Sequence, residues 1–184
     1  MIKAFLFDLD GTLFDSSSAN VEAYSRAFEE SGINFDKSKY IDSFGLRFND
    51  MVDVIAPNIN EETRDKIKNL KVKYYKQALV KVKPNQALLN IISTFRGQFK
   101  TALSTTARKS NVDNLLAYFD ISTSMFDVII TGEDVVRGKP DPECYLLAMK
   151  QLGVKPSDCV IFEDSDVGVA AATAAGAHVI RVVI

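Results

Sequence analysis

Short apolar runs alternate with segments of helical hydrophobic spacing through the second part of this 184-residue chain. The apolar runs lie at residues 99–104, 126–131, 159–162 and 178–184, and another run occupies residues 2–7. Helical patterns separate them at residues 86–95, 108–118, 142–152 and 167–175. Strands that alternate with helices pair in parallel, because each helix carries the chain back to the same edge of the sheet. The pattern therefore predicts an α/β fold with a Rossmann-like parallel sheet covered by helices on both faces.

Residues 15–83 interrupt this alternation with a long helical stretch. Val21, Tyr24 and Phe28 recur at helical spacing, and a second, longer helix is expected from an Asn60 cap to Lys83. We therefore expect an inserted α-helical cap domain at residues 15–83. It would sit on an α/β core domain formed by residues 1–14 and 84–184.

The charge balance argues against nucleic acid as a partner. The chain has 22 Lys and Arg residues against 24 Asp and Glu residues, whereas nucleic-acid binding favours a basic excess. Basic residues do cluster at 66–73, and we interpret them as the solvated face of an amphipathic helix. The longest weakly polar stretch, residues 167–180, is shorter than the ~20 residues of a membrane helix, so no membrane partner is expected.

The two cysteines, Cys144 and Cys159, have no metal-ligand spacing and predict no disulfide framework. A reducing, cytoplasmic location is therefore expected.

The chain ends on the apolar residues Val182, Val183 and Ile184, which predict a buried or paired last strand. We expect a monomer or a weak homodimer.

Polar residues follow four of the predicted strands. Ligand sites of such sheets lie beyond the carboxyl ends of the strands, so these residues should meet at one rim. Taken singly, each group has an ordinary structural explanation as a turn, a helix cap or an exposed lysine. A calcium loop is disfavoured because its glycine stands at position six, whereas Gly11 is fourth from Asp8. The joint placement of these four groups at the strand ends favours a single site. The groups are Asp8-Leu9-Asp10-Gly11, Thr105-Thr106, Gly138-Lys139-Pro140 and Glu163-Asp164.

In this order the motifs resemble those of the haloacid dehalogenase superfamily, in its branch of phosphatases and phosphomutases with a helical cap. The resemblance runs from end to end of the chain. It is carried by Phe7-Asp8-Leu9-Asp10-Gly11-Thr12-Leu13, Leu103-Ser104-Thr105, Gly138-Lys139-Pro140-Asp141-Pro142 and Phe162-Glu163-Asp164-Ser165 with Gly168. It implies a Mg²⁺-dependent phosphatase that hydrolyses a small phosphorylated metabolite through an aspartyl-phosphate.

The resemblance also implies roles for individual residues. Asp8 is the expected nucleophile and Asp10 the acid that protonates the leaving group and then activates water. Thr105 and Lys139 are expected to hold the transferring phosphoryl group. The ligands implied for Mg²⁺ are Asp8, the carbonyl of Asp10, and Asp164, with Glu163 acting through water. A hard cation suits these carboxylates, which otherwise repel one another.

Substrate contacts are expected from Gly11, Thr106 and Arg47. Arg47 ends Phe44-Gly45-Leu46-Arg47, which resembles a cap loop of sugar-phosphate enzymes, although an ordinary surface arginine is an equal alternative.

A β-phosphoglucomutase-type mutase remains an alternative function. Asn20 stands where such mutases carry a histidine, which favours hydrolysis. A third alternative is a binding protein without turnover. Asp10 makes dehalogenation unlikely because that reaction needs no leaving-group proton.

Overall fold

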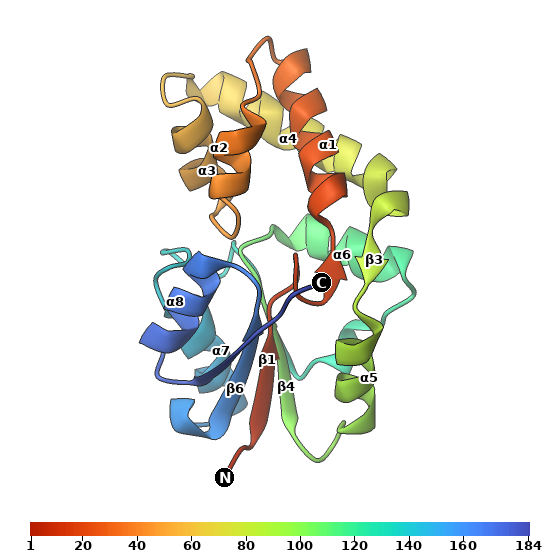
Figure 1. The fold of residues 1–184 in the computed structure, drawn as a ribbon, viewed down its shortest axis with the longest axis vertical. Coiled ribbons are helices and arrows are strands. Elements are labelled where there is room, and N and C mark those ends of the chain that lie inside the picture. Colours follow the sequence, from red (N-terminus) through yellow and green to blue (C-terminus); the bar gives the residue numbers. More distant parts are fainter.

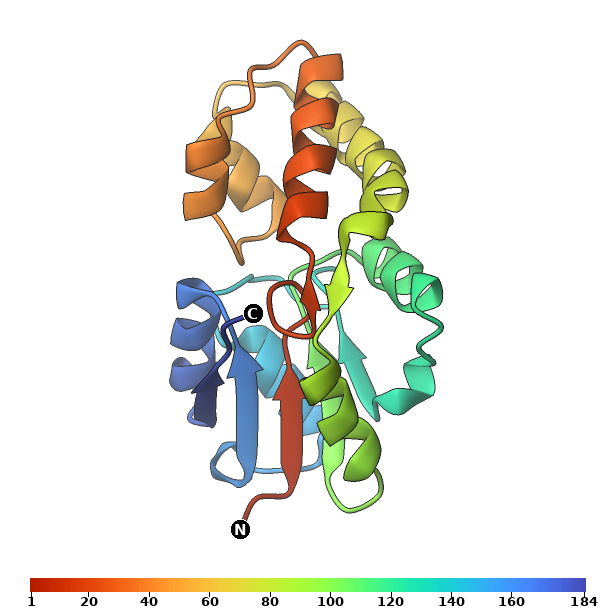
Figure 2. The same cartoon turned by 45° about the vertical axis from the view of Figure 1, so that its right-hand side comes forward.

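The computed structural model of the protein describes residues 1–184. Its centre is a five-stranded sheet in the order β5-β4-β1-β6-β7, and every neighbouring pair is parallel. The strands are β1 (Ala4–Phe7), β4 (Lys100–Ser104), β5 (Val128–Ile130), β6 (Cys159–Glu163) and β7 (His178–Arg181). The predicted α/β class and parallel sheet are therefore confirmed (Figures 1 and 2).

Helices cover both faces of this sheet. Each strand contributes side chains to both faces, because its successive side chains point in opposite directions. Ala4 and Leu6 of β1 lie in one buried cluster with residues of α7 and α8, whereas Phe7 lies in a second cluster with residues of α5 and α6. These apolar contacts supply the main force that holds helices to the sheet. The four helices are α5 (Gln86–Thr94), α6 (Lys109–Tyr118), α7 (Glu143–Leu152) and α8 (Asp166–Ala174).

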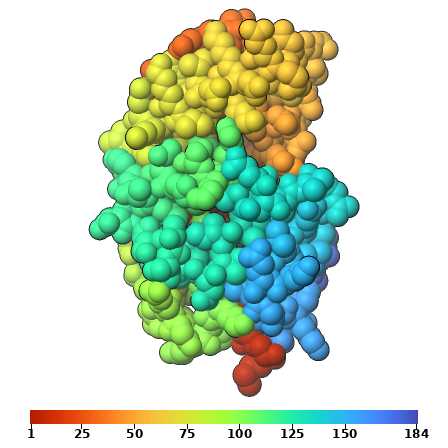
Figure 3. Space-filling view, turned by 180° about the vertical axis from the view of Figure 1, so that it is seen from behind, coloured from red at the N-terminus to blue at the C-terminus, as the bar shows by residue number.

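A layer of four further helices lies over the carboxyl ends of the strands (Figure 1). They are α1 (Ser17–Glu30), α2 (Lys37–Asp42), α3 (Phe48–Ile55) and α4 (Glu61–Ala78). Asn60 caps α4 as predicted, since its side chain accepts a hydrogen bond from the Thr63 amide at 2.8 Å. Seen from behind, the atoms of the cap lie in direct contact with the atoms of the core (Figure 3).

The chain crosses between the two layers on a pair of short strands. These are β2 (Phe14–Asp15) and β3 (Lys83–Pro84), which pair antiparallel through Phe14 with Pro84 and Asp15 with Lys83. The crossing coincides with the predicted boundaries of residues 15–83. The division into two domains stays a prediction.

The structure corrects several predicted element ends. The helix expected to reach Lys83 ends at Ala78, and a 3₁₀ turn (Leu79–Lys81) follows it. Pro84 disfavours a helical conformation at Lys83, which is extended and pairs with Asp15 instead. The last strand stops at Arg181, and Ile180, Val183 and Ile184 are exposed, so the chain end is paired on one side but not buried. Two other 3₁₀ turns, Thr123–Met125 and Pro156–Asp158, precede β5 and β6.

None of the helices combines the length and the apolar character needed to cross a membrane.

Candidate active site

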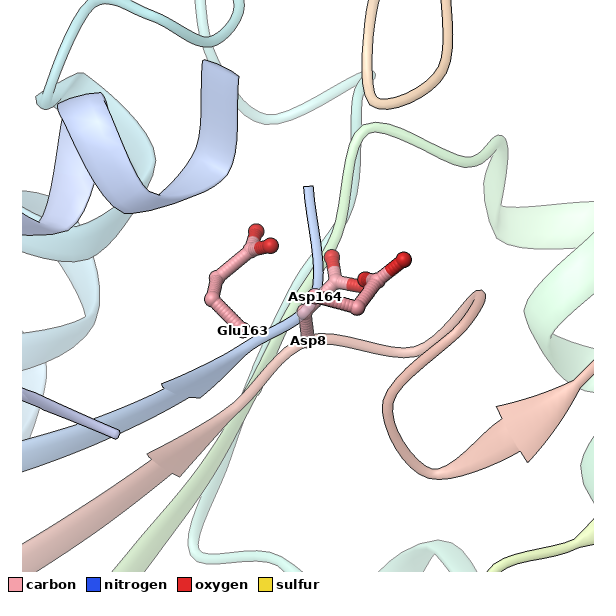
Figure 4. A group of neighbouring side chains, drawn as sticks. All are labelled: Asp8, Glu163 and Asp164. Carbon is pink, nitrogen blue, oxygen red and sulfur yellow. The ribbon is translucent and has the colours of Figure 1, made fainter. Parts of the chain in front are cut away.

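The predicted site residues come together where the strands end beneath the cap. Asp8 follows β1 directly, Thr105 follows β4, and Glu163 ends β6 immediately before Asp164. Lys139 reaches them from the loop between β5 and α7. Figure 4 shows Asp8, Glu163 and Asp164 on the two neighbouring strand ends. This meeting follows from parallel pairing, because the register places Phe7 beside both Leu103 and Phe162.

Lys139 joins two of the carboxylates in the interior. Its ammonium donates to Asp8 Oδ1 at 2.6 Å and to Glu163 Oε1. The side chains of all three residues are buried. The Tyr145 hydroxyl on α7 also donates to Glu163 Oε1, at 2.8 Å. The ammonium of Lys139 is thus fixed beside Asp8 by a buried network.

The backbone and side chain of Ser165 complete this network. The Ser165 amide and hydroxyl both donate to Glu163 Oε2 at 3.1 Å. Gly168 on α8 makes room for the Glu163 carboxylate, since a Cβ atom there would overlap it. Both oxygens of Glu163 are therefore engaged by protein donors.

Burial controls the ionisation of these groups. Burial raises the pKa of Asp8 well above its ordinary value, because the attraction of Lys139 only partly offsets burial and repulsion by Glu163 and Asp164. Burial, with repulsion from Glu163, also raises the pKa of Asp164 to about 6. Burial acts against ionisation of Glu163, but the charge and hydrogen bond of Lys139 hold its pKa below the ordinary value. Three carboxylates thus face one ammonium.

This excess of negative charge fits a divalent cation. One oxygen from each of Asp8, Glu163 and Asp164 lies within 4.8 Å of the others. Carboxylate oxygens are the ligands preferred by hard cations such as Mg²⁺. Gly11, with φ +88°, permits the approach of Asp164, because a Cβ atom there would overlap that carboxylate. The donor set and its charge therefore suit the predicted metal.

Asp10 lies apart from the three clustered carboxylates. Its Oδ1 accepts hydrogen bonds from the Ser16 hydroxyl and from Asn20 Nδ2, the latter at 3.0 Å. Asn20 Nδ2 also donates to the Ser16 hydroxyl oxygen at 3.1 Å. Asp10 is thereby held on the cap side of the site, two residues from Asp8. Such a position suits a side-chain carboxyl group that serves the leaving alcohol rather than one that ligates the metal.

A cavity of about 140 Å³ lies between the cap and the core at this point. Asp8, Asp10, Asp164, Gly11, Thr105 and Thr106 all line it on the core side. The Thr105 hydroxyl oxygen accepts from the Ala107 amide at 3.0 Å, which leaves its own O–H available as a donor. The cap contributes residues from α1, from the loop before α3 and from α4: Asn20, Tyr24, Phe44, Leu46, Lys68 and Lys71.

Arg47 does not line this cavity, although the sequence suggested a substrate contact. Its guanidinium donates through Nη1 to the Val136 carbonyl at 2.5 Å, in the exposed loop that precedes Lys139. A Cβ atom on Gly138 would overlap the Arg47 side chain. Arg47 therefore joins the cap to the core, and we do not carry it into the proposed substrate site.

Four residues of the site were not singled out as site residues: Ser16, Tyr24, Lys71 and Tyr145. The prediction of a solvated basic face is wrong for Lys71, which is buried with only 6% of its surface exposed. The sequence does contain an indication that Lys71 is buried. Lys71 stands four residues after Ile67 and four before Tyr75, on the buried stripe of α4. Tyr145 lies inside the first half of α7, where helical spacing alone indicates only a core residue.

Residues 5–182 match the model of the haloacid dehalogenase-like hydrolase family, and the chain belongs to this family. It is 31% identical over 182 residues to the phosphorylated carbohydrates phosphatase of Thermotoga maritima, covering 95% of this chain and 82% of that one. It is 34% identical over 181 residues to the validoxylamine A 7′-phosphate phosphatase of Streptomyces hygroscopicus subsp. limoneus, covering 96% and 83%.

Among solved structures, a β-phosphoglucomutase from Clostridium difficile superposes with a TM-score of 0.85 at 26% identity, covering 98% of this chain and 84% of that one. The predicted superfamily and the phosphatase class of enzyme are thus confirmed.

Proposed function

We propose that this chain is a Mg²⁺-dependent phosphatase of small phosphorylated metabolites, phosphorylated sugars among them, and that Asp8 carries the phosphoryl group between two steps. The observation that carries the proposal is the buried Lys139–Asp8 contact beside Glu163 and Asp164. A bound Mg²⁺, held by Asp8, Asp164 and the Asp10 carbonyl, would neutralise negative charge on the carboxylates and the phosphoryl oxygens. Glu163 would assist by fixing Lys139 and by holding metal-bound water.

In the first step Asp8 attacks phosphorus. Oδ1 of Asp8 is engaged by Lys139, which leaves Oδ2 as the attacking atom. A bond forms between Oδ2 and phosphorus, the bond from phosphorus to the ester oxygen breaks, and Asp10 transfers its proton to the departing alcohol. Lys139 and the Thr105 hydroxyl bind oxygens of the transferring group, on which negative charge is concentrated.

In the second step water releases phosphate. Asp10, now ionised, takes a proton from water as the water oxygen attacks phosphorus, and the bond to Asp8 breaks. Asp10 is protonated and Asp8 ionised again at the end, so the cycle closes. Ser16 and Asn20 hold the Asp10 carboxylate in place for both transfers.

A phosphosugar mutase would use the same Asp8 chemistry but return the phosphoryl group to a sugar. Asn20 supports hydrolysis, because an amide donates a hydrogen bond to Asp10 but cannot exchange a proton near neutral pH as a histidine does. The phosphatases among the relatives support the same choice. Conversion of β-glucose 1-phosphate to the 6-phosphate without phosphate release would favour the mutase.

Removal of divalent metal is expected to stop phosphate release. Without a cation, Asp8 faces two other carboxylates and a phosphate dianion, and this repulsion opposes attack. The measurement is inorganic phosphate released from fructose 1-phosphate and glycerol 3-phosphate with Mg²⁺, with EDTA, and with EDTA followed by excess Mg²⁺. Activity should be lost in EDTA and regained with Mg²⁺. Undiminished release in EDTA would contradict the metal assignment.

A cytoplasmic location is part of the proposal, supported by two cysteines that are both buried and unbridged. We propose a monomer or a weak homodimer, for which the exposed edge strand β7 offers an unpaired surface. The acidic charge balance supports neither nucleic acid nor membrane as a partner.

A further inference from the structure

The cap loop between α2 and α3, residues 43–47, reaches down to the core (Figures 1 and 2). Two of its residues contact core segments that surround the buried ammonium of Lys139. Gly45 lies against Ser165, and Arg47 lies against the loop that carries Lys139. The proposed reaction assigns no role to either contact.

Arg47 supplies the only hydrogen bond that the Val136 carbonyl accepts. Its Nη1 donates to this oxygen at 2.5 Å, and no backbone amide of the core reaches the same oxygen. A charged donor makes a stronger hydrogen bond than a neutral one. The cap therefore holds the backbone of this loop at a point three residues before Lys139.

Gly138 provides the space for this contact. A Cβ atom on Gly138 would overlap Cγ and Cδ of Arg47, so the stem of the arginine packs directly on the glycine backbone. The same Cβ atom would stand 3.5 Å from the Cβ of Arg47, which is an ordinary van der Waals separation. Gly138 is not among the glycines with positive φ, so alanine meets no backbone strain there. Arginine at position 47 thus requires glycine at position 138, whereas alanine at position 47 does not.

The segment from Val136 to Lys139 lies in the irregular stretch between β5 and α7, so no helix or strand fixes it. Glu143 restrains it from the core, because its carboxylate accepts hydrogen bonds from the Val136 and Arg137 amides at 2.9 Å and 3.1 Å. Arg47 restrains it from the cap. Segments with few hydrogen bonds open most readily, so loss of the Arg47 contact should loosen the backbone that carries Lys139.

From these contacts we infer that Arg47 is a positioning residue for the reaction: it fixes the backbone before Lys139, so that the ammonium is held in place only while the cap lies on the core. The inference rests on the proposed function, in which Lys139 binds the transferring phosphoryl group. Placement of such a group matters, because a misplacement of about 1 Å can lower a rate by about 10²-fold. Arg47 thereby makes the chemical step depend on the contact between cap and core.

The test compares four proteins: the unmodified chain, Arg47→Ala, Gly138→Ala and the double variant. Arg47→Ala removes the hydrogen bond, and Gly138→Ala displaces the Arg47 side chain from the Val136 carbonyl. Each single variant should lower kcat for phosphate release from fructose 1-phosphate by about tenfold, with little change in KM, as expected for one lost hydrogen bond of a charged donor. The double variant should be no slower than either single variant, because the added methyl group has space once the arginine stem is gone.

Arg96→Ala is the matched control. Arg96 also donates to a backbone carbonyl, that of Ser124 at 2.7 Å, but it precedes β4 and so lies at the opposite edge of the sheet from the active site. Its replacement should leave kcat unchanged. Thermal unfolding of each variant reports whether it is folded.

Hydrogen exchange in the ligand-free protein tests the positioning role without catalysis. The amide protons of Val136 and Arg137 should exchange about tenfold faster in Arg47→Ala than in the unmodified chain, for the same lost hydrogen bond. A residue that only binds substrate would not alter this exchange.

Unchanged kcat or unchanged exchange in folded Arg47→Ala protein would overturn the inference. A higher KM with kcat unchanged would do the same, since it would make Arg47 a substrate contact. Multiplied losses in the double variant would show that Arg47 and Gly138 act independently and would also contradict it. Failure of the proposed function is a separate result, in which exchange responds as expected but the unmodified protein releases no phosphate.

Discussion

Asparagine in place of Asp8 is expected to reduce phosphate release by at least about 10⁴-fold while the protein stays folded. The amide has nearly the same volume as the carboxylate but no nucleophilic oxygen. The fold should tolerate it, because burial already raises the pKa of Asp8 and a neutral group relieves repulsion from Glu163 and Asp164. The measurement is the rate of phosphate release from fructose 1-phosphate at saturating Mg²⁺, with thermal unfolding of the same sample.

Asp42→Asn is the matched control for this change. Asp42 ends α2 on the exposed surface of the cap and does not line the cavity. Its replacement should leave the rate unchanged. Retention of more than a trace of activity by folded Asp8→Asn protein would remove Asp8 from the role of nucleophile.

Methionine in place of Lys139 is expected to lower both turnover and stability. Turnover should fall by about 10²–10³-fold, because the ammonium beside Asp8 is lost as an electrostatic clamp for the phosphoryl group. The free energy of unfolding without metal should fall by about 3–5 kcal/mol, because Asp8 and Glu163 lose the cation with which they are buried. Steady-state kinetics and urea denaturation in EDTA measure the two effects.

Lys150→Met, on the exposed side of α7, serves as the control for losing one positive charge. It should change neither quantity appreciably. An increase in KM with kcat unchanged in Lys139→Met would indicate ground-state binding only and would contradict a role in the transition state.

The core site could be predicted from the sequence because its members follow strands. Parallel pairing brings the carboxyl ends of β1, β4 and β6 to one edge, so Asp8, Thr105 and Glu163 had to lie near one another. Lys139 is different, since it belongs to a loop and no periodicity places it. Its role as a phosphoryl clamp came from the family resemblance, and its ammonium lies 2.6 Å from Asp8.

The cap side of the site was less predictable, because it depends on how two layers pack. The basic residues of α4 were interpreted as one solvated face, yet Lys71 turns inward between Tyr24 and Tyr75. For Arg47 a substrate contact and a surface position were equal alternatives, and its side chain joins the cap to the Val136 carbonyl. Both outcomes depend on contacts between segments far apart in the sequence, which local hydrophobic spacing does not encode.

The most direct test of the central claim is to trap the phosphoryl group on the enzyme. The protein is mixed with a hydrolysed ester and Mg²⁺, quenched in acid within one turnover, digested, and examined by mass spectrometry. The account predicts one phosphoryl group on the peptide that carries Asp8, absent in Asp8→Asn and absent when EDTA replaces Mg²⁺. Phosphate release at full rate with no phosphoryl group on Asp8 at any quench time, or with the group on a different residue, would contradict it.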